Sequence, residues 1–167
     1  MAIEIERKFL LASDDWRDAV EASQRLAQGY LGGDKASVRV RIGGEQAWLN
    51  IKSRQRGVAR QEFEYAVPAA DAECMLAELC LPGRIEKLRH HVRFAGMLWE
   101  IDEFLDDNAG LVVAEIELPA VDATFARPSW LGREITDDIR YYNNALAQRP
   151  FCQWSADERE HRETPAC

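Results

Sequence analysis

Residues 3–9 read IEIERKF, and charged and apolar side chains alternate along them. In an extended strand, side chains two positions apart share a face and lie roughly 6–7 Å apart, so this spacing predicts a β-strand. One face carries Glu4, Glu6 and Lys8, and the other carries the two isoleucines and Phe9. Charged strand faces are commonly solvated. This stretch alone therefore leaves open whether its charged face meets water or a ligand.

The same alternation returns along the rest of the chain. It predicts further strands at 26–31, 37–42, 47–53, 59–67, 84–94, 98–104 and 111–119. Gly43-Gly44 supplies a tight turn that joins two of them in a hairpin. Residues 127–133 are expected to form a loop. Helices are expected from Ser13 to Val20, over 69–81 and, capped by Thr136, over 137–148.

Acidic residues recur in pairs two positions apart, so both members of a pair lie on one face of their strand. The pairs are Glu4 and Glu6, Glu62 and Glu64, Glu100 and Asp102, and Glu115 and Glu117. Like charges at this spacing repel one another, and a plain solvent-facing surface would interleave the signs. A divalent cation between the carboxylates would remove that repulsion, and oxygen ligands favour magnesium or manganese over zinc.

Basic residues occupy the corresponding faces of neighbouring strands, at Lys8, Arg39, Arg41, Lys52, Arg60, Lys87 and Arg89. Guanidinium and ammonium groups are suited to phosphate oxygens, which accept their hydrogen bonds. Together, the acidic and basic rows predict a site for a polyphosphate and a metal ion.

A closed barrel would hold both sets of charges, because eight strands enclose a space wide enough for side chains or one small ligand. The predicted fold is α+β and mainly β: an eight-stranded antiparallel closed β-barrel, or tunnel, with a charged lumen and a few flanking α-helices. Its apolar strand faces would point outward, beneath helices or a partner subunit. A homodimer is expected if such a face stays uncovered. A flat sheet with a solvated charged face is the structural alternative.

Composition sets further limits on the class of protein. The chain has 167 residues, of which 47% are hydrophobic and 30% charged, as is typical of globular proteins. We expect one domain over 1–150 and a polar tail over 151–167. The sequence has no run of about 20 apolar residues and no start typical of a signal peptide, so we expect no membrane span and a cytoplasmic location. The net charge of −8 argues against a general nucleic-acid binder, and the four cysteines form no C-x-x-C pair for zinc.

The order of these motifs resembles the CYTH family, the triphosphate tunnel metalloenzymes. The resemblance runs over about residues 2–148, and it rests on Glu4-x-Glu6-x-Lys8, Arg39-Val40-Arg41, Lys52, Arg60-Gln61-Glu62, Lys87-Leu88-Arg89, Glu100-Ile101-Asp102 and Glu115-Ile116-Glu117. The stretches 28–31 (QGYL) and 138–143 (DIRYYN) resemble small bacterial members. The resemblance implies an eight-stranded antiparallel tunnel that acts on triphosphate compounds with Mg²⁺ or Mn²⁺. Since no appended module is evident, it favours the stand-alone bacterial form.

The resemblance also implies roles for individual residues. The phosphates would be held by Lys8, Arg39, Arg41, Lys52, Arg60, Lys87 and Arg89, with Arg140 at one mouth of the tunnel. The metal would be held first by Glu4, Glu6 and Glu117, then Glu115, with Glu62, Glu64, Glu100 and Asp102 completing its coordination or orienting water. Tyr30 would position a phosphate or the attacking water, and packing within the sheet is its alternative role. The catalytic set is then Glu4, Glu6, Lys8, Tyr30, Glu100 and Asp102.

By the same resemblance, we expect metal-dependent hydrolysis of inorganic triphosphate to pyrophosphate and phosphate, with water attacking a terminal phosphorus in line. Alternatives within the family are a class IV type adenylyl cyclase and a nucleoside or thiamine triphosphatase. An alternative of another class is a polyphosphate-binding module without catalysis. The residues that would hold the ligand recognise phosphate and metal only. The sequence therefore leaves open the organic moiety and the choice between Mg²⁺ and Mn²⁺.

Overall fold

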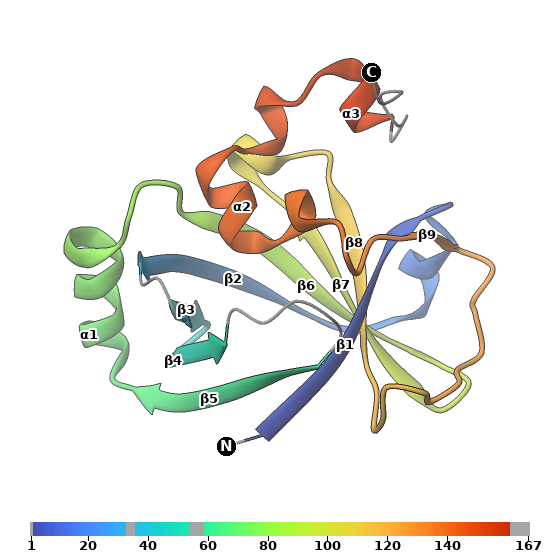
Figure 1. The fold of residues 1–167 in the computed structure, drawn as a ribbon, viewed down its shortest axis with the longest axis horizontal. Helices are drawn as coiled ribbons and strands as arrows, with labels where there is room; N and C mark the ends of the chain where they lie inside the picture. The colour runs from blue at the N-terminus through green and yellow to red at the C-terminus, as the bar shows by residue number, and fades with distance from the viewer. Residues whose placement is uncertain (1, 33–35, 54–58, 161–167) are drawn as a thin grey trace.

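The computed structural model describes residues 2–32, 36–53 and 59–160, and these residues form one nine-stranded antiparallel sheet (Figure 1). The strands are β1 (Ala2–Leu11), β2 (Val20–Gly32), β3 (Ala36–Gly43), β4 (Gln46–Ser53), β5 (Ala59–Val67), β6 (Ile85–Phe94), β7 (Met97–Phe104), β8 (Val112–Glu117) and β9 (Leu131–Glu134). They run β5-β4-β3-β2-β6-β7-β8-β1-β9, and β1 also pairs with β5. Within the described residues, this pairing closes β1–β8 into a barrel and confirms the predicted eight-stranded tunnel.

β1 closes the barrel because its two halves pair with different strands. Ala2–Ile5 is antiparallel to β5, and Glu6–Leu10 is antiparallel to β8. β9 pairs with the end of β1 through a register shift, so the prediction of a loop over 127–133 is wrong from Leu131 onward. The charged positions of β1 therefore lie where the first and last strands of the ring meet.

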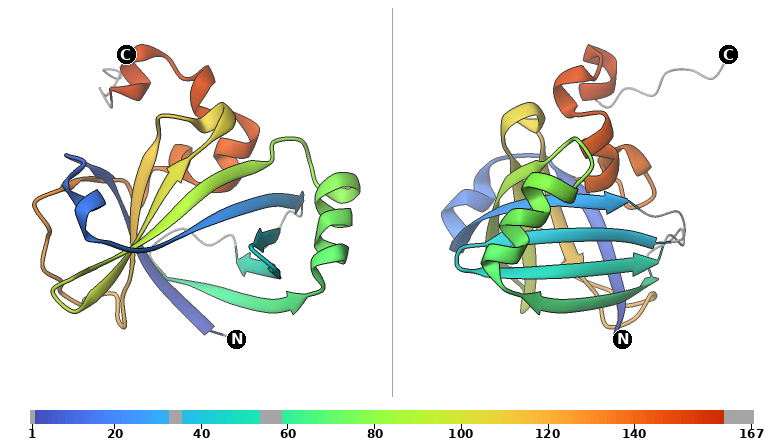
Figure 2. Two further views of the ribbon diagram at one scale, coloured as in Figure 1. Left: turned by 180° about the vertical axis from the view of Figure 1, so that it is seen from behind. Right: turned by 90° about the vertical axis from the view of Figure 1, so that its left-hand side faces the viewer.

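The helical segments are short and lie against the outside of the barrel or over its end (Figures 1 and 2). They are η1 (Asp15–Ala19), α1 (Ala69–Cys74), η2 (Met75–Leu79), η3 (Asp106–Asn108), η4 (Ile139–Tyr141), α2 (Asn143–Gln148), η5 (Phe151–Gln153) and α3 (Ala156–Arg159). α1 crosses the outer face of the β3–β4 part of the wall (Figure 2), where Ala72 packs on Val40 and Ala47. None of the helices in the described part of the chain is long and apolar enough to cross a membrane.

Apolar strand faces point outward over much of the barrel, as predicted. Phe9, Trp99 and Ile116 form one buried cluster with Trp16 of η1 and Trp130 of the segment before β9. The rings of Trp99 and Trp130 meet edge to face, with centroids 5.4 Å apart. At the start of β1 no described helix or loop covers the outer face of the barrel, as the 66% exposure of Ile3 shows. The homodimer stays a prediction.

One end of the lumen is apolar, which the sequence did not predict. The inward-facing rows that hold Lys8, Lys87 and Glu115 continue into apolar residues, and these pack in a cluster with the segment after β9. The cluster contains Leu10, Ile85, Phe104, Val113, Tyr141, Leu146, Phe151 and Trp154. The prediction of a polar tail from residue 151 is therefore wrong for its first residues, which belong to the core.

Each of the predicted helices is shorter than expected or interrupted. β2 begins at Val20, because Val20–Gln28 pairs along β6, so only η1 remains of the first helix. The second ends at Leu79 with a turn of π-helix. The third is split into η4 and α2. Thr136 does not cap it, because the Thr136 hydroxyl accepts from the Lys8 backbone N–H and donates to Glu134.

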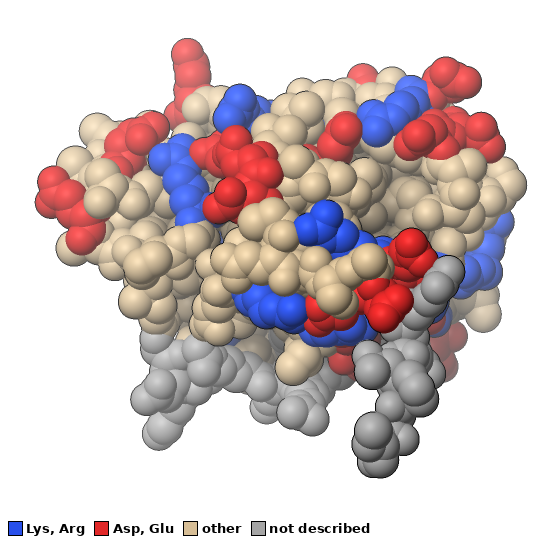
Figure 3. Space-filling view, turned by 90° about the horizontal axis from the view of Figure 1, so that it is seen from above, with Lys and Arg blue, Asp and Glu red and all other residues tan. Residues whose placement is uncertain are grey.

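On the face seen from above, Lys and Arg side chains are interspersed with Asp and Glu side chains (Figure 3). No single sign of charge dominates this face of the described residues.

Gly83 fixes how closely α2 approaches the barrel. Its φ is +102°, and a Cβ atom added there would lie 1.8 Å from the Ala147 carbonyl oxygen on α2. We expect Gly83→Ala to lower the free energy of unfolding by about 3 kcal/mol or more, since strained backbone and overpacking each cost about 1–3 kcal/mol. Urea unfolding followed by circular dichroism measures this difference.

Gly96→Ala is the matched control. Gly96 also has a positive φ, +80°, but an added Cβ would meet no atom within 4 Å. Gly96→Ala should lower the free energy of unfolding only by the cost of holding alanine in a left-handed backbone conformation, about 1–2 kcal/mol. Equal losses in the two variants would contradict the close docking of α2.

Candidate active site

The lumen contains a cavity of about 640 Å³, to which each of β1–β8 contributes at least one side chain. Its charged lining consists of Glu4, Glu6, Lys8, Arg39, Arg41, Lys52, Glu62, Glu64, Lys87, Arg89, Glu100 and Glu115. A second cavity of about 380 Å³ shares four of these carboxylates and adds Glu117, Leu98, Leu118 and Pro119. The tunnel therefore has a mixed, cation-rich section and an acidic section.

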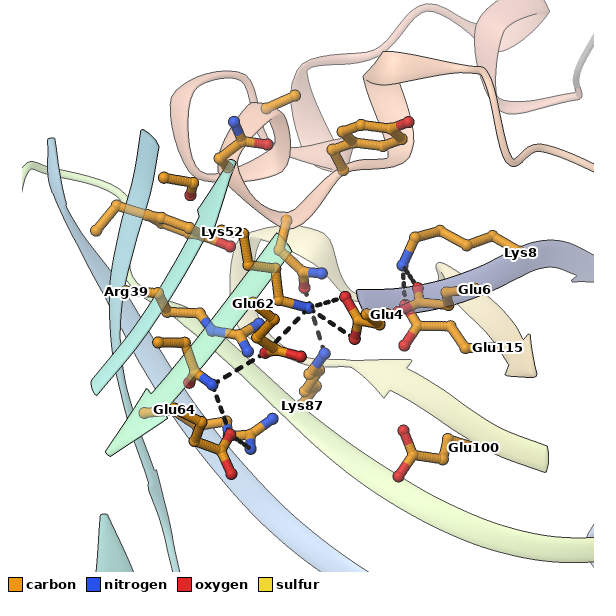
Figure 4. A pocket seen from close by; sticks show the side chains of 18 of the residues that line it. Glu4, Glu6, Lys8, Arg39, Lys52, Glu62, Glu64, Lys87, Glu100 and Glu115 are labelled. Carbon is orange, nitrogen blue, oxygen red and sulfur yellow. Dashed lines mark hydrogen bonds and ion pairs between the residues drawn. The ribbon is translucent and has the colours of Figure 1, made fainter. Parts of the chain in front are cut away.

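Lys8 lies beside two carboxylates of the acidic section (Figure 4). Its ammonium contacts Glu6 on the same strand and Glu115 on β8. Burial alone would lower the pKa of Lys8, but the two carboxylates outweigh it and raise the pKa above its usual range. Lys8 is therefore a fixed positive charge inside the lumen.

Lys52 connects β4 to both strands that close the barrel. Its Nζ atom lies 2.6 Å from Oε2 of Glu4 and 3.4 Å from Oε1 of Glu62. Asn50, which is fully buried on the same strand, donates from Nδ2 to Glu62 at 3.2 Å and to Glu64 at 2.5 Å. This side of the cavity is thus a network in which each carboxylate already has a donor.

Lys87 and Arg89 on β6 share the fully buried carboxylate of Asp102. Lys87 Nζ lies 2.5 Å from Oδ2, and both Nε and Nη2 of Arg89 donate to the same carboxylate at 2.7 Å. Arg89 also reaches Glu100 and, at 2.9 Å, Glu115. Burial lowers the pKa of Lys87 to about 8. The negative charge of Asp102 opposes this shift, and the positive charge of Arg89 adds to it.

Arg39 and Arg41 on β3 face the cavity with donors left over. Arg41 pairs with Glu64 at 3.1 Å and lies over the ring of Trp48. The Nε atoms of both arginines are buried and have no hydrogen-bond partner among the described residues. Buried donors of this kind are costly unless an acceptor arrives. The two guanidinium groups therefore suit an anionic ligand.

Carboxylates crowd one another in the acidic section. Burial, and next the charge of Glu115, raises the pKa of Glu6. Burial, and next Glu4 and Glu100, raises the pKa of Glu117. Hard oxygen donors that repel one another fit a divalent cation. No three His, Cys, Asp or Glu side chains of the described residues are grouped tightly enough to hold a metal ion as they stand.

Most of the predicted site residues line one of the two cavities, and three differ. Asp102 is fully buried behind Lys87 and Arg89 and is not among the lining residues described. Arg140 pairs with Asp138 at 2.6 Å and likewise does not appear among them. Arg60 lies on β5 opposite Glu4 in the register, but its side chain is outside the described part of the chain.

Several uncharged polar residues of the cavity were not predicted. Asn50 lies two positions before Lys52 on β4 and shares its face, so the period-two pattern could have identified Asn50 as a cavity residue. Asn143, Asn144 and Gln148 reach the cavity from α2, and Asn143 Oδ1 accepts from Lys87 at 3.3 Å. No sequence pattern indicates where a short helix docks, so the place of these residues in the cavity could not be predicted.

Comparison with known proteins agrees with this geometry. The CYTH domain profile matches residues 2–149. An inorganic triphosphatase of Acetivibrio thermocellus is 43% identical over 152 residues, which cover 90% of this chain and 97% of that protein. One from Nitrosomonas europaea is 37% identical, covering 86% and 96%.

Solved structures give the same result for the fold. The crystal structure of an inorganic triphosphatase matches with a TM-score of 0.65 and 34% identity, and the match covers 88% of this chain and 95% of that one. A protein of Pyrococcus horikoshii, 15% identical with a TM-score of 0.54 over 71% of this chain and 81% of that one, shares the fold alone. The chain belongs to the CYTH domain family.

Proposed function

We propose that this protein hydrolyses inorganic triphosphate to pyrophosphate and phosphate inside its tunnel, with a divalent cation. The observation that carries the proposal is a closed lumen in which Lys and Arg side chains with spare donors stand beside a crowded group of carboxylates. Two relatives that are 43% and 37% identical over most of the chain bear the name inorganic triphosphatase, which supports the same substrate.

The basic residues would hold the phosphate chain. Arg39 and Arg41 would turn their free Nε–H groups to its oxygens, and Lys8, Lys52, Lys87 and Arg89 would share their charge between it and the lumen carboxylates. Fixed positive charges around the transferred phosphoryl group stabilise the charge that develops on its oxygens. Asp102 would act only by holding Lys87 and Arg89 in place.

Glu4, Glu6, Glu115 and Glu117 would hold a divalent cation, and Glu100 lines the same acidic section. When bound, Mg²⁺ or Mn²⁺ would supply further stabilisation of negative charge on the phosphate oxygens. Glu4 and Glu115 now pair with Lys52, Lys8 and Arg89. A phosphate chain that draws those cations to itself would free both carboxylates for the metal.

The cavity lining favours an inorganic substrate. Its aromatic members among the described residues are Tyr30 and Tyr142, and no Trp or Phe of the described part lines it. A nucleobase or a thiazolium ring would gain little stacking there, whereas phosphate oxygens meet charged donors on many sides.

Phosphate release from tripolyphosphate tests the proposal. Purified protein should release phosphate with MgCl₂ or MnCl₂ and release none with EDTA. ATP should give less phosphate and no cyclic nucleotide. Absence of release from tripolyphosphate with both metals would overturn the proposal, as would faster formation of cyclic nucleotide from ATP. Tight tripolyphosphate binding without turnover would favour a binding module instead.

The pKa of Lys87 predicts an alkaline limit. At a pKa of about 8, Lys87 loses its charge as the pH rises through this value, so kcat/KM for tripolyphosphate should fall above it. kcat/KM reports the free enzyme, in which the lumen holds no phosphate. Lys87→Arg keeps its charge over this range and should remove that limb of the profile. A limb that persists unchanged in the variant would contradict the assignment.

A further inference from the structure

Gln28 and Tyr30 are neighbouring inward-facing residues of β2, and they differ in whether they reach the cavity. Tyr30 lines the main cavity, whereas Gln28 is fully buried and is not one of the lining residues described. The Gln28 amide donates from Nε2 to the Tyr30 hydroxyl oxygen at 3.2 Å. Gln28 therefore contacts the lining of the cavity through the Tyr30 hydroxyl.

We propose that Gln28 is a positioning residue that directs the Tyr30 O–H into the cavity as a hydrogen-bond donor to the substrate's phosphate chain. The inference rests on the proposed function. A phenol has one proton to donate and accepts through its oxygen. Once the Gln28 N–H occupies that oxygen, the phenol proton points elsewhere, and a phosphate oxygen is an acceptor of the right kind.

The residues of β3 that lie directly opposite Gln28 and Tyr30 have side chains that only donate hydrogen bonds. In the β2–β3 register, Tyr30 lies opposite Arg39 and Gln28 lies opposite Arg41. Guanidinium groups only donate hydrogen bonds. They therefore favour an amide whose carbonyl faces β3 and whose NH₂ faces Tyr30. The Gln28 Oε1 atom is buried and accepts no hydrogen bond from the described residues, and the Nε2 atom makes the bond to Tyr30.

Burial keeps the phenol protonated. It is the largest influence on Tyr30 and raises the pKa above its usual value, although the charges of Arg39 and Lys8, and next a hydrogen bond from Arg39, act in the opposite direction. A neutral Tyr30 donates, whereas a phenolate would repel phosphate. The hydrogen bond from Gln28 therefore has a directional effect.

The backbone between the two side chains is held tightly from outside. A Cβ atom on Gly29 would lie 2.7 Å from Cys80 Sγ and 3.0 Å from a Leu76 methyl group. Leu76 and Cys80, which follow α1, therefore pack closely against the outer side of β2 at Gly29. Gln28 and Tyr30 are fixed on a strand that has little room to shift.

A double-mutant cycle tests the inference through turnover of tripolyphosphate. Gln28→Met keeps the side-chain volume and removes the amide, and Tyr30→Phe removes the hydroxyl. We expect Gln28→Met to lower kcat/KM about tenfold, the value of one neutral hydrogen bond. In the Tyr30→Phe background the same substitution should change kcat/KM less than about twofold, since no hydroxyl remains to be directed.

A structural role would give a different pattern, because loss of packing would lower kcat/KM by the same factor in both backgrounds. That result, or wild-type turnover in Gln28→Met, would overturn the inference while leaving the proposed function intact. Wild-type protein without tripolyphosphate turnover would overturn both. If Gln28→Met unfolds, Gln28→Glu serves in its place, because its ionised carboxylate keeps the shape but offers only acceptors. The loss of kcat/KM in Gln28→Glu should again disappear in the Tyr30→Phe background. Gln24→Met, at an exposed position on the same strand, is the control and should retain wild-type turnover.

Discussion

Arg89→Met is expected to lower the free energy of unfolding by about 3–5 kcal/mol, the usual cost of removing one partner from a buried ion pair. Arg89 donates to Asp102 at 2.7 Å and to Glu115 at 2.9 Å, and it also contacts Glu100. Asp102 is fully buried, and Glu115 is nearly so. Methionine would fill part of the space but leave these carboxylates with less positive charge than they need.

The variant's cost should shrink at acid pH. Burial alone would raise the pKa of Asp102 and of Glu115, but Arg89 and the neighbouring lysines outweigh it and lower both. A carboxyl group with a lowered pKa stabilises the fold at neutral pH, and this stability is lost as the pH falls through its folded pKa. The difference between wild type and Arg89→Met should therefore be largest near neutral pH.

Urea unfolding across pH measures both effects. Arg93→Met is the matched control, because Arg93 lies on the same strand and faces the same way but is 59% exposed, 3.4 Å from Glu21. An exposed pair of this kind contributes less than about 1 kcal/mol. Equal destabilisation by the two substitutions would contradict a central role for Arg89.

The alternation along each strand was enough to predict most of the strand side chains that line the lumen. Period two is a property of the extended backbone, so Glu4, Glu6 and Lys8 had to share a face whatever the tertiary fold. Rows of like charge that repel along a strand are neutralised between strands. Arg89 lies directly opposite Asp102 in the β6–β7 register. The sequence shows which charged residues share a strand face, but only the register of the strands shows which acidic and basic residues pair.

The rest depended on packing that has no local signature. Phe151 and Trp154 lie in a polar stretch, yet they complete the apolar end of the lumen. Residues 21–25 are exposed and lack an apolar stripe, and they form a strand because β6 pairs with this part of β2. Asn143 enters the site because α2 docks at Gly83. These features arise from contacts between distant segments.

Glu6→Gln is expected to lower tripolyphosphate turnover by about 10²- to 10³-fold, the usual loss for a group that stabilises transition-state charge. Glu6 lines both cavities and is one of the carboxylates assigned to the cation. The substitution keeps the shape and removes one anionic ligand. Without metal, the substitution also removes one of the two carboxylates that contact the Lys8 ammonium. Because burial and then Glu115 raise the pKa of Glu6, its ionised form opposes folding, and this cost grows as the pH rises through the folded pKa.

Thermal unfolding with and without MgCl₂ or MnCl₂ separates this loss from a folding defect. A cation that binds the native state raises the unfolding temperature of wild-type protein, and the rise should be smaller for Glu6→Gln at the same concentration. Glu21→Gln, at an exposed position on β2 outside both cavities, should match wild type in turnover and in the metal-dependent shift. A Glu6→Gln protein that keeps the full shift and more than about a tenth of the turnover would remove Glu6 from the metal site, because the acidic section would then hold its cation without the Glu6 carboxylate.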